Sequence, residues 1–523
     1  MAIVAVGILM AALVLLRVSS GLAQEAGPTM LVDDLGVRTA VSGLTQPTSM
    51  AFIGRDDLLV LEKNTGKVNR VQLQRDDTGQ IVGQTVTTAL DLDVNSTGER
   101  GLLGIAVHPE FPANPGVYLY WTCRSTLPLD ADPFQPEEQK CSDSTRSGTN
   151  GDVLGGGAGR FEAMLQVPLL GNQVDRFVWD GTKLAFDTNV VRLRAFLNDR
   201  TQPRPASAHA GGVLRFGPDG KLYVVIGDSL RRGQTQNLPM GWAPPDPDDQ
   251  FGGPEPDNAH LTGVILRLND DGTTPADNPF YSVGANIGGE AGSNIQKIYA
   301  YGIRNSFGMD FDPASGKLWA QENGDDAFDE LNLVRPGTNS GWVQIMGPVS
   351  RIEQFKQIEV DGAPPDPRPN LLQALRWPPT NIADSPEEAL SRLFALSGST
   401  YSDPELSWKY GVAPGGIGFV KGAGLGPQYQ RDLFVGAAGA DLEGGYLFHF
   451  NLTGNRRAIA VDDPRLEDRV ADNSFKDDLT ESESMLIGKD FGVGTDIQTG
   501  PDGNLYVVSL TDGAIYEIHR VTD

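Results

Sequence analysis

A strand-and-turn motif occurs twice in this chain, almost unchanged and far apart in the sequence. It reads GPDGKLYVV at 217–225 and GPDGNLYVV at 500–508. The Gly-Pro-Asp-Gly part predicts a tight turn, because proline presets φ, aspartate bonds its own backbone and glycine accepts positive φ. The Leu-Tyr-Val-Val part predicts a β-strand, since it is rich in β-branched and aromatic residues. The repeat therefore indicates a fold built from similar β-hairpins.

Six segments share a wider plan of an apolar strand, a turn rich in Pro, Asp, Asn or Gly, and a second strand. They are residues 47–71, 105–121, 213–226, 309–321, 430–450 and 497–518. Recurrence at a long and irregular period is typical of a β-propeller, whose blades are four-stranded sheets around a central channel. We therefore expect an all-β, six-bladed β-propeller with long inserted loops, and a pair of β-sandwiches is the alternative. The insertions fall near 122–160, 230–260, 345–400 and 455–485.

The acidic composition argues against one class of partner. The formal net charge is −26, and binding to phosphates needs a basic face. Nucleic acid is therefore not an expected partner, and neither is an anionic lipid surface.

The N-terminus carries a short apolar run, AIVAVGILMAALVLL at 2–16. Its length suits the core of a signal peptide better than a membrane span. We expect a signal peptide over 1–23, cleaved near Ala23, then a linker over 24–40 and the propeller over 41–523. The protein is thus expected to be exported, periplasmic or secreted. An uncleaved N-terminal anchor is the alternative, and a membrane contact is expected only through that segment.

The chain contains two cysteines, Cys123 and Cys141, in a polar stretch rich in Pro and Asp. In an exported protein they are expected to form one disulfide that closes this loop. Two independent thiols are the alternative.

The stretch AHAGGVLRFGPDGKLYVVIGD at 208–228 places a histidine and an aspartate at the two ends of one predicted hairpin. Because a hairpin folds back on itself, His209 and Asp228 are expected to lie close enough to touch. A carboxylate beside an imidazole fixes its tautomer and raises its basicity, as a general base requires. A surface histidine and a solvated turn aspartate are the alternative.

Seven motifs in order resemble one known family. They are GERGLLGIAVHPEF at 98–111, HAGGVLRFGPDGKLYVVIGD at 209–228, LTGVILRLNDDGTTPADNPF at 261–280, YGIRNSFGMDFDP at 301–313, ENGDDAFDELNLVRPGTNSGW at 322–342, APGG at 413–416 and DIQTGPDGNLYVVS at 496–509. From about Val41 to Arg520 the chain resembles the soluble quinoprotein glucose dehydrogenases and aldose sugar dehydrogenases, the glucose/sorbosone dehydrogenase family. The resemblance implies a six-bladed β-propeller that holds pyrroloquinoline quinone (PQQ) and a calcium ion.

The resemblance also implies roles for individual residues. His209 would take the proton of a sugar hydroxyl while hydride moves to the quinone, and Asp228 would orient it. Arg304 and Asn305 match an Arg-Asn pair that contacts the quinone. An arginine there would stabilise negative charge on the reduced quinone oxygen. Glu99 falls where the family often has glutamine beside the cofactor.

The calcium site would lie in the segment 324–330. Gly324 and Asp325 match the pair whose backbone carbonyls hold calcium in the family, although the second residue is usually proline there. Asp329 and Glu330 match an acidic pair that can support another calcium. Crowded carboxylates repel one another unless a cation lies among them, and an ordinary solvated turn is the alternative.

The cofactor-anchoring end departs from the family pattern. The family usually meets the three carboxylates of the cofactor with late basic residues. Here the segment 433–450 contains no Lys or Arg. The segment FGVGTD at 491–496 contains none either, although the family has two arginines just before the position of Asp496. A trianion without such partners would bind weakly. Lys409 and Lys421 are the candidates to substitute for them.

Three functions follow from these observations. The first is an exported PQQ-dependent sugar dehydrogenase with a small sugar as substrate and an electron acceptor that the sequence does not identify. The second is a non-catalytic propeller that binds a glycan or a protein. The third is a calcium-dependent, lactonase-like hydrolase with the metal as Lewis acid.

Overall fold

The computed structural model describes most of the chain. The described residues are 27–125, 140–146, 167–195, 208–229, 237, 259–364, 379–439, 442 and 444–521. The signal peptide expected over 1–23 lies outside the described residues, as do parts of the insertions expected near 122–160 and 230–260. No helix within the described ranges is long and apolar enough to cross a membrane.

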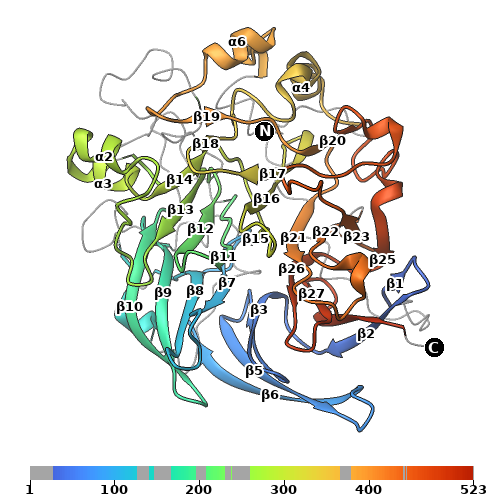
Figure 1. Ribbon diagram of the computed structural model, residues 1–523. Coiled ribbons are helices and arrows are strands. Elements are labelled where there is room, and N and C mark those ends of the chain that lie inside the picture. The colour runs from blue at the N-terminus through green and yellow to red at the C-terminus, as the bar shows by residue number, and fades with distance from the viewer. Residues whose placement is uncertain are drawn as a thin grey trace, which may run out of the picture.

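The described strands form six sheets, which Figure 1 shows arranged in a ring. Three of them begin in the N-terminal part of the chain. The first holds β3 (Pro47–Gly54), β4 (Asp57–Glu62), β5 (Lys67–Arg75) and β6 (Ile81–Asp91). The second holds β7 (Leu102–Val107), β8 (Gly116–Thr122), β9 (Asn172–Trp179) and β10 (Leu184–Leu193). The third holds β11 (Leu214–Phe216), β12 (Leu222–Ile226), β13 (Val264–Leu268), β14 (Ile298–Tyr301), β18 (Thr338–Asn339) and β19 (Thr400–Tyr401).

The other three sheets come mainly from the C-terminal part. The fourth holds β15 (Met309–Phe311), β16 (Leu318–Glu322), β17 (Ala327–Val334), β20 (Leu406–Tyr410) and β24 (Val470–Ala471). The fifth holds β21 (Pro414–Phe419), β22 (Leu433–Ala437), β23 (Tyr446–Phe450), β25 (Leu486–Lys489) and β1 (Thr29–Met30). The sixth holds β26 (Gly494–Thr499), β27 (Leu505–Ser509), β28 (Ala514–Arg520) and β2 (Leu35–Val41).

The first strands of these sheets contact one another in a closed circle. β3 packs against β7, β7 against β11, β11 against β15, β15 against β21, β21 against β26, and β26 against β3. Sheets that meet at their first strands and spread outward have the arrangement of a propeller. The architecture is therefore all-β and propeller-like, as the sequence predicts.

Two N-terminal strands complete sheets formed by the end of the chain. β2 pairs antiparallel with β28, from Leu35 opposite Arg520 to Val41 opposite Ile515. β1 pairs with β25, placing Thr29 opposite Lys489. The structure thus differs from the linker expected over 24–40, because the described part of that segment supplies edge strands to two sheets.

The repeated motif folds as the same hairpin in both places. In the first copy, Gly217 N donates to Lys221 O at 2.8 Å and joins β11 to β12. In the second, Gly500 N donates to Asn504 O at 2.8 Å and joins β26 to β27. The tight turn predicted from Gly-Pro-Asp-Gly is confirmed.

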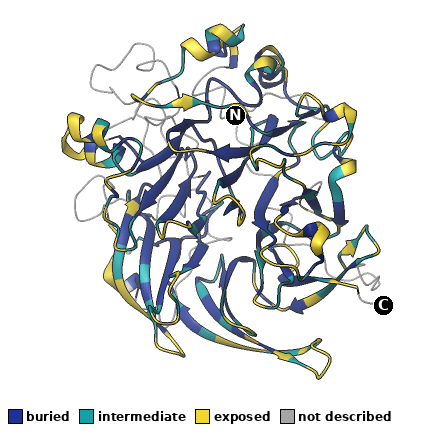
Figure 2. Ribbon diagram, viewed as in Figure 1, coloured by how far each residue is buried: buried dark blue, intermediate teal, exposed yellow. Residues whose placement is uncertain are grey.

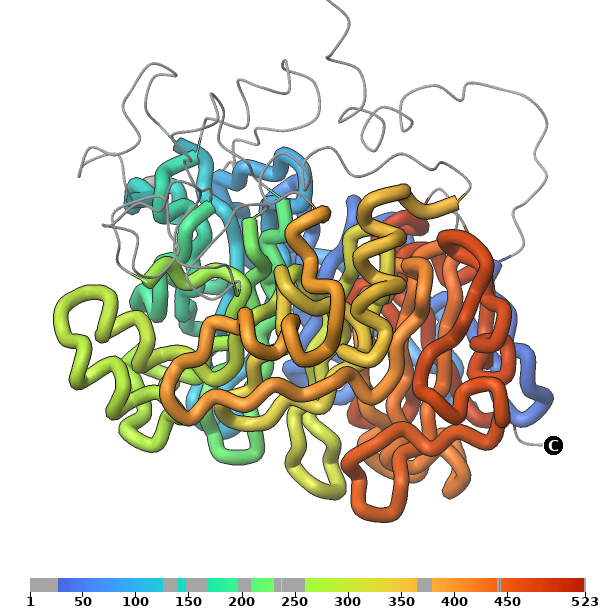
Figure 3. Tube along the Cα trace, turned by 90° about the horizontal axis from the view of Figure 1, so that it is seen from above, coloured from blue at the N-terminus to red at the C-terminus, as the bar shows by residue number. Residues whose placement is uncertain are grey.

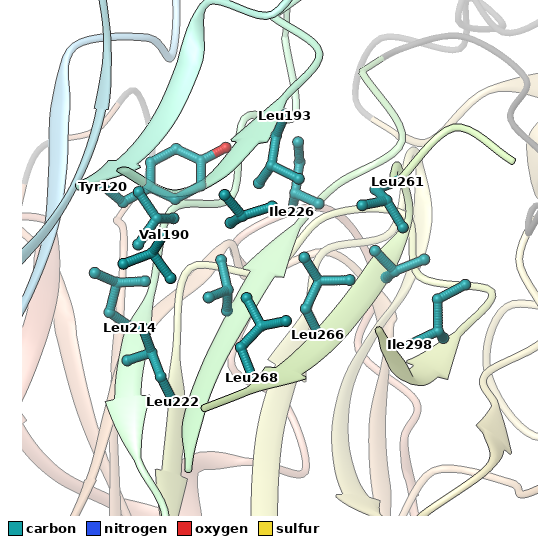
Figure 4. Close-up of a cluster of buried hydrophobic side chains, with 14 of the residues drawn as sticks. Tyr120, Val190, Leu193, Leu214, Leu222, Ile226, Leu261, Leu266, Leu268 and Ile298 are labelled. Carbon is teal, nitrogen blue, oxygen red and sulfur yellow. The ribbon is translucent and has the colours of Figure 1, made fainter. Parts of the chain in front are cut away.

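Most inner strands are buried on both faces, as Figure 2 shows by their dark blue colour, whereas the outer strands β6 and β10 are partly exposed. In β12, Leu222, Val224 and Ile226 pack toward the second sheet, in the cluster shown in Figure 4. The alternate residues Tyr223 and Val225 pack in a different cluster with the fourth sheet. Successive strand residues point to opposite faces, so a strand between two sheets is apolar throughout, which explains the unbroken run LYVVI.

The helices lie in the connections between strands. α2 (Tyr281–Ile287) and α3 (Gly289–Ile295) lie at the outer edge of the ring in Figures 1 and 3. α4 (Ile352–Asp361) and α6 (Pro386–Ser391) lie in the insertion expected near 345–400. The disulfide predicted between Cys123 and Cys141 is confirmed, with the two Cα atoms 6.0 Å apart.

Candidate active site

His209 and Asp228 meet at one end of the β11–β12 hairpin. His209 lies shortly before β11, and Asp228 lies just after β12, so the hairpin brings the two ends of the stretch together. The His209 Nδ1 atom is 2.5 Å from Asp228 Oδ1. Both residues are buried, with 5% and 3% of their surface exposed. The contact expected from the hairpin is present in the structure.

Asp228 is held by two further groups. Trp342 Nε1 donates to Asp228 Oδ2 at 3.0 Å, and Asp228 N donates to Arg304 O at 2.8 Å. Because the carboxylate is an acceptor, the neutral His209 ring carries its proton on Nδ1 and leaves Nε2 as the basic nitrogen. The arrangement orients His209 as a general base, provided that Nε2 faces a substrate.

Glu99 links the backbone before β11 to the segment between β14 and β15. Its Oε2 atom accepts hydrogen bonds from His209 N at 2.7 Å, Ala210 N at 3.3 Å and Asn305 Nδ2 at 3.3 Å. Lys63 holds the loop in front of Glu99, with Nζ donating to the carbonyl oxygen of Gly98 at 2.8 Å. Burial lowers the pKa of Lys63 to about 8, and Glu99 partly opposes this shift. Glu99 therefore holds the His209 backbone and the Asn305 side-chain amide at one carboxylate oxygen.

Arg304 is held rigidly by the segment that follows β16. Its backbone N donates to Glu322 Oε1 at 2.5 Å, and its side chain donates to Asn323 O at 2.9 Å and Asp325 Oδ1 at 2.7 Å. The guanidinium carbon lies 5.5 Å from the ring centroid of Trp342. Burial lowers the pKa of Arg304, but the charges of Asp325 and then Asp228 outweigh it, so the net pKa is raised. Arg304 is a fixed positive charge that interacts with the carboxylate of Asp228.

Several polar atoms in this group have no hydrogen-bond partner within the described part of the chain. They are Arg304 Nε, Asn305 Oδ1 and Asn323 Oδ1. A buried donor or acceptor without a partner costs about 1–3 kcal/mol, which a ligand that supplies the missing partner would offset. An oxygen-bearing ligand such as a quinone satisfies the donor on Arg304. The Arg304 Nε donor therefore fits an oxygen of the cofactor that the resemblance implies, whereas the two amide oxygens need a hydrogen-bond donor.

The lysines expected to anchor the cofactor make other contacts. Lys409 Nζ lies 5.1 Å from the ring centroid of Tyr410. Lys421 lies just beyond the end of β21, and its Nζ is 3.2 Å from Asp310 Oδ1. Asn323, which contacts Arg304, instead bonds Pro414 O at the start of β21. These contacts of Lys409 and Lys421 thus do not bring either side chain to Arg304.

The turn between β16 and β17 is organised by Asp329. Its carboxylate accepts backbone hydrogen bonds from Gly324 at 2.8 Å, Val412 at 2.7 Å and Ala413 at 2.8 Å. Burial raises the pKa of Asp329, and these backbone donors oppose the shift. Gly324 is required in the turn, because an added Cβ would lie 1.9 Å from Ala327 O.

Glu330 points to the other face of β17 and lies opposite Glu322 in the ladder. It accepts hydrogen bonds from Gly347 N at 2.6 Å and Asn332 Nδ2 at 2.8 Å. Burial raises the pKa of Glu330 to about 7, and burial together with the charge of Glu330 raises that of Glu322 well above its usual range. Asp329 and Glu330 therefore serve different faces of the strand.

These bonds differ from the calcium coordination that the resemblance implies. Among the described residues there is no group of three or more His, Cys, Asp or Glu side chains arranged to hold a metal ion. Asp325 is paired with Arg304, and its carbonyl oxygen accepts a hydrogen bond from Lys476 at 3.3 Å. Asp325, one of the residues matched to the calcium ligands, thus contacts two cationic side chains of the protein in this structure, Arg304 and Lys476.

Sequence reasoning missed three residues of this region. Trp342 is the last residue of the motif at 322–342, and its indole N–H, a hydrogen-bond donor, is the signal that could have identified it. Lys476 comes from the insertion near 455–485, which no motif covers, and its Nζ lies 2.5 Å from Asp326 Oδ1. Glu359 on α4 accepts a hydrogen bond from Asp326 N at 3.1 Å, and burial, Asp325 and Asp326 raise its pKa well above the usual range.

Comparison with known proteins shows what the chain is similar to. Residues 44–142 and 171–359 match the family model described as Glucose / Sorbosone dehydrogenase. An uncharacterised protein of Synechocystis is 26% identical over 90% of this chain and 82% of its own length. Quinoprotein glucose dehydrogenase B of Acinetobacter calcoaceticus is 26% identical over 59% of this chain, and the match spans about half, 52%, of that relative.

A solved structure shares the fold. The PQQ-bound form of aldose sugar dehydrogenase from Streptomyces coelicolor is 22% identical to this chain, with a TM-score of 0.52. The likeness covers 95% of this chain and 100% of that one.

Proposed function

The chain belongs to the glucose/sorbosone dehydrogenase family, and from this membership we propose that it is an exported, PQQ-dependent sugar dehydrogenase. The observation that carries the proposal is the buried 2.5 Å contact of His209 Nδ1 with Asp228 Oδ1, which Trp342 links to the guanidinium of Arg304. The matched relative that is named as a quinoprotein glucose dehydrogenase supports the choice of cofactor and substrate class.

Each residue has a part in this reaction. When bound, the quinone supplies a hydride acceptor. His209 Nε2 takes the proton of the sugar hydroxyl, and Asp228 holds the ring in the orientation for this transfer. Arg304 presents a fixed positive charge, which stabilises negative charge that develops on an adjacent oxygen. Glu99 and Asn305 keep the histidine and arginine segments in register, through the hydrogen bonds to Glu99 Oε2.

We also propose that the six sheets are the six blades of one propeller. The closed circle of contacts among β3, β7, β11, β15, β21 and β26 supports this count. The additional short strands β1, β18, β19 and β24 extend blades at their outer sides. The start of β11 then lies on the same end of the ring as the segment that carries Arg304.

Export is part of the proposal. The Cys123–Cys141 disulfide supports it, because disulfides form and persist in oxidising compartments. A signal peptide over 1–23 would deliver the chain there. In the proposed reaction the substrate is a small sugar, and a separate electron acceptor reoxidises the cofactor.

One observation favours a second function. Val493 and Thr495 stand at the positions aligned with the two late arginines of the family, and neither bears a charge. A propeller with this site but without firm cofactor anchoring would bind a glycan or a protein without turnover.

Reconstitution tests the two functions against each other. Purified protein is mixed with PQQ and assayed for dye reduction with a panel of aldoses, and PQQ binding is measured separately by its absorbance. Dye reduction that needs both PQQ and sugar supports the dehydrogenase. Sugar binding with no PQQ binding and no turnover would support the binding module instead.

A further inference from the structure

The acidic segment after β16 meets a lysine from a distant part of the chain. Lys476 Nζ lies 2.5 Å from Asp326 Oδ1 and 3.3 Å from the carbonyl oxygen of Asp325. A carboxylate and a backbone carbonyl are oxygen ligands of the kind that a calcium ion takes. With respect to the Asp325 carbonyl, the ammonium therefore occupies a place that the family resemblance gives to a metal.

The segment that carries Lys476 is anchored before the lysine reaches the site. Asn473 is fully buried and bonds the backbone of Tyr410 in both directions, at 2.8 Å and 2.9 Å. Asp477 N donates to Gly411 O at 2.9 Å. The lysine is thus delivered by a preorganised turn and not by a long free loop.

A second contact fixes this segment from the side of α4. Arg351, just before α4, pairs with Asp472 at 3.0 Å, and Lys476 N donates to Pro364 O beyond the helix at 3.4 Å. Figure 3 shows the gold α4 next to the red part of the chain that contains these residues. Two insertions that no motif covers therefore meet over the acidic segment.

The charges of Asp325 and Asp326 are matched without a metal. The carboxylate of Asp325 pairs with Arg304 at 2.7 Å, and that of Asp326 pairs with Lys476 at 2.5 Å. A divalent ion placed on the Asp325 carbonyl would have to displace the ammonium, since two cations cannot share these oxygens without repulsion.

We propose that Lys476 is a built-in cation that takes the place of a calcium ion on the segment 324–330. It acts as a positioning residue, because it holds the backbone of Asp325 while the Asp325 side chain holds Arg304. The protein then needs no calcium to keep Arg304 in place beside His209.

The test measures metal content and unfolding, so its outcome is independent of turnover. Wild type and Lys476→Met are dialysed against calcium and then against buffer, and bound calcium is counted by elemental analysis. Thermal unfolding is followed with a chelator and with added calcium. We expect the melting temperature of wild type to be the same in both conditions. Lys476→Met is expected to bind about one calcium more per chain and to melt lower with the chelator.

Two further variants make the comparison specific. Lys476→Arg keeps a cation and is expected to behave like wild type. Lys409→Met removes a lysine that lies over the Tyr410 ring and is expected to gain no calcium. The proposal is contradicted if wild type and Lys476→Met bind the same amount of calcium and respond equally to the chelator.

Poor folding of Lys476→Met is also informative. In that case the variant is expressed and purified with calcium throughout. Recovery of folded protein by calcium, and not by magnesium, supports the proposal. A variant that stays unfolded with calcium present contradicts it, since the segment would then need the lysine for a reason that a metal cannot replace.

Discussion

Trp342 donates a hydrogen bond from Nε1 to Oδ2 of Asp228 at 3.0 Å, on the oxygen that His209 does not use. The same indole ring lies beside the guanidinium of Arg304, 5.5 Å from its central carbon. One side chain thus orients the partner of the proposed base and contacts the fixed positive charge. The proposed catalytic group is four residues, His209, Asp228, Arg304 and Trp342, and not the histidine–aspartate pair alone.

His209→Gln should abolish most turnover without loss of folding. A positioned general base contributes roughly 10²–10⁴-fold to rate, so kcat is expected to fall by about that factor. The matched control is His449→Gln, because His449 also pairs with an aspartate, Asp432 at 2.9 Å, but on β23. Steady-state dye reduction and the melting temperature are measured for both. Unchanged turnover in His209→Gln would remove the histidine from the mechanism.

Trp342→Phe should have a smaller effect, confined to kcat. The variant keeps an aromatic ring beside Arg304 but loses the donor to Asp228. A single hydrogen bond contributes about 0.5–1.5 kcal/mol, so kcat is expected to fall roughly 2–10-fold with KM for the sugar nearly unchanged. A change in KM alone would show that the indole acts on substrate binding and not through Asp228.

Glu330→Gln should flatten the dependence of stability on pH. The pKa of Glu330 is raised by burial to about 7, against about 4.3 for an unperturbed glutamate. The folded state therefore favours the protonated form of Glu330. The contribution of Glu330 to the free energy of unfolding is present at low pH and is lost as the pH rises to about 7. Urea unfolding at a series of pH values from 5 to 8 measures it.

We expect wild type to lose stability across that pH range faster than Glu330→Gln. Glu387→Gln, on the exposed first turn of α6, is the control and should follow wild type. Parallel curves for wild type and Glu330→Gln would mean that the carboxyl group stays ionised in the folded protein.

Replacing both Cys123 and Cys141 by serine should destabilise the fold by at most ~2–4 kcal/mol. The bridge reduces the conformational freedom of the unfolded chain in the loop that it closes. Both cysteines are buried in the hydrophobic cluster between the first and second sheets, and Cys123 directly follows β8. Urea unfolding of oxidised wild type and the double serine variant measures the difference. Equal midpoints would show that the bridge does not contribute to stability.

Much of the fold could be predicted because its signals are local. Gly217 and Gly500 begin turns whose geometry depends on only a few neighbouring residues, and both turns form as expected. The contact of His209 with Asp228 follows from the same hairpin. The strands β1 and β2 were missed because each is an edge strand, and its partner comes from the other end of the chain.

The rest of the site depends on contacts between distant segments. Arg304 and Asn305 could be selected by resemblance, but their bonds to Asp325 and Glu99 come from other sheets. Lys476 lies more than a hundred residues from the segment it contacts, and nothing in its local sequence marks it. Lys409 was selected by type and position alone, and its neighbour is Tyr410.

The pairing of β2 with β28 has a consequence for how the chain is made. The strand that completes the last sheet is among the first parts of the described chain to be synthesised, and its partner is the last. Residues 35–41 must therefore wait, unpaired, until residues 514–520 have left the ribosome. If the protein is exported, they must wait until those residues have crossed the membrane. The sixth sheet can be completed only after β28 is available, so a chain truncated before β28 leaves β2 unpaired and the outer edge of β27 exposed.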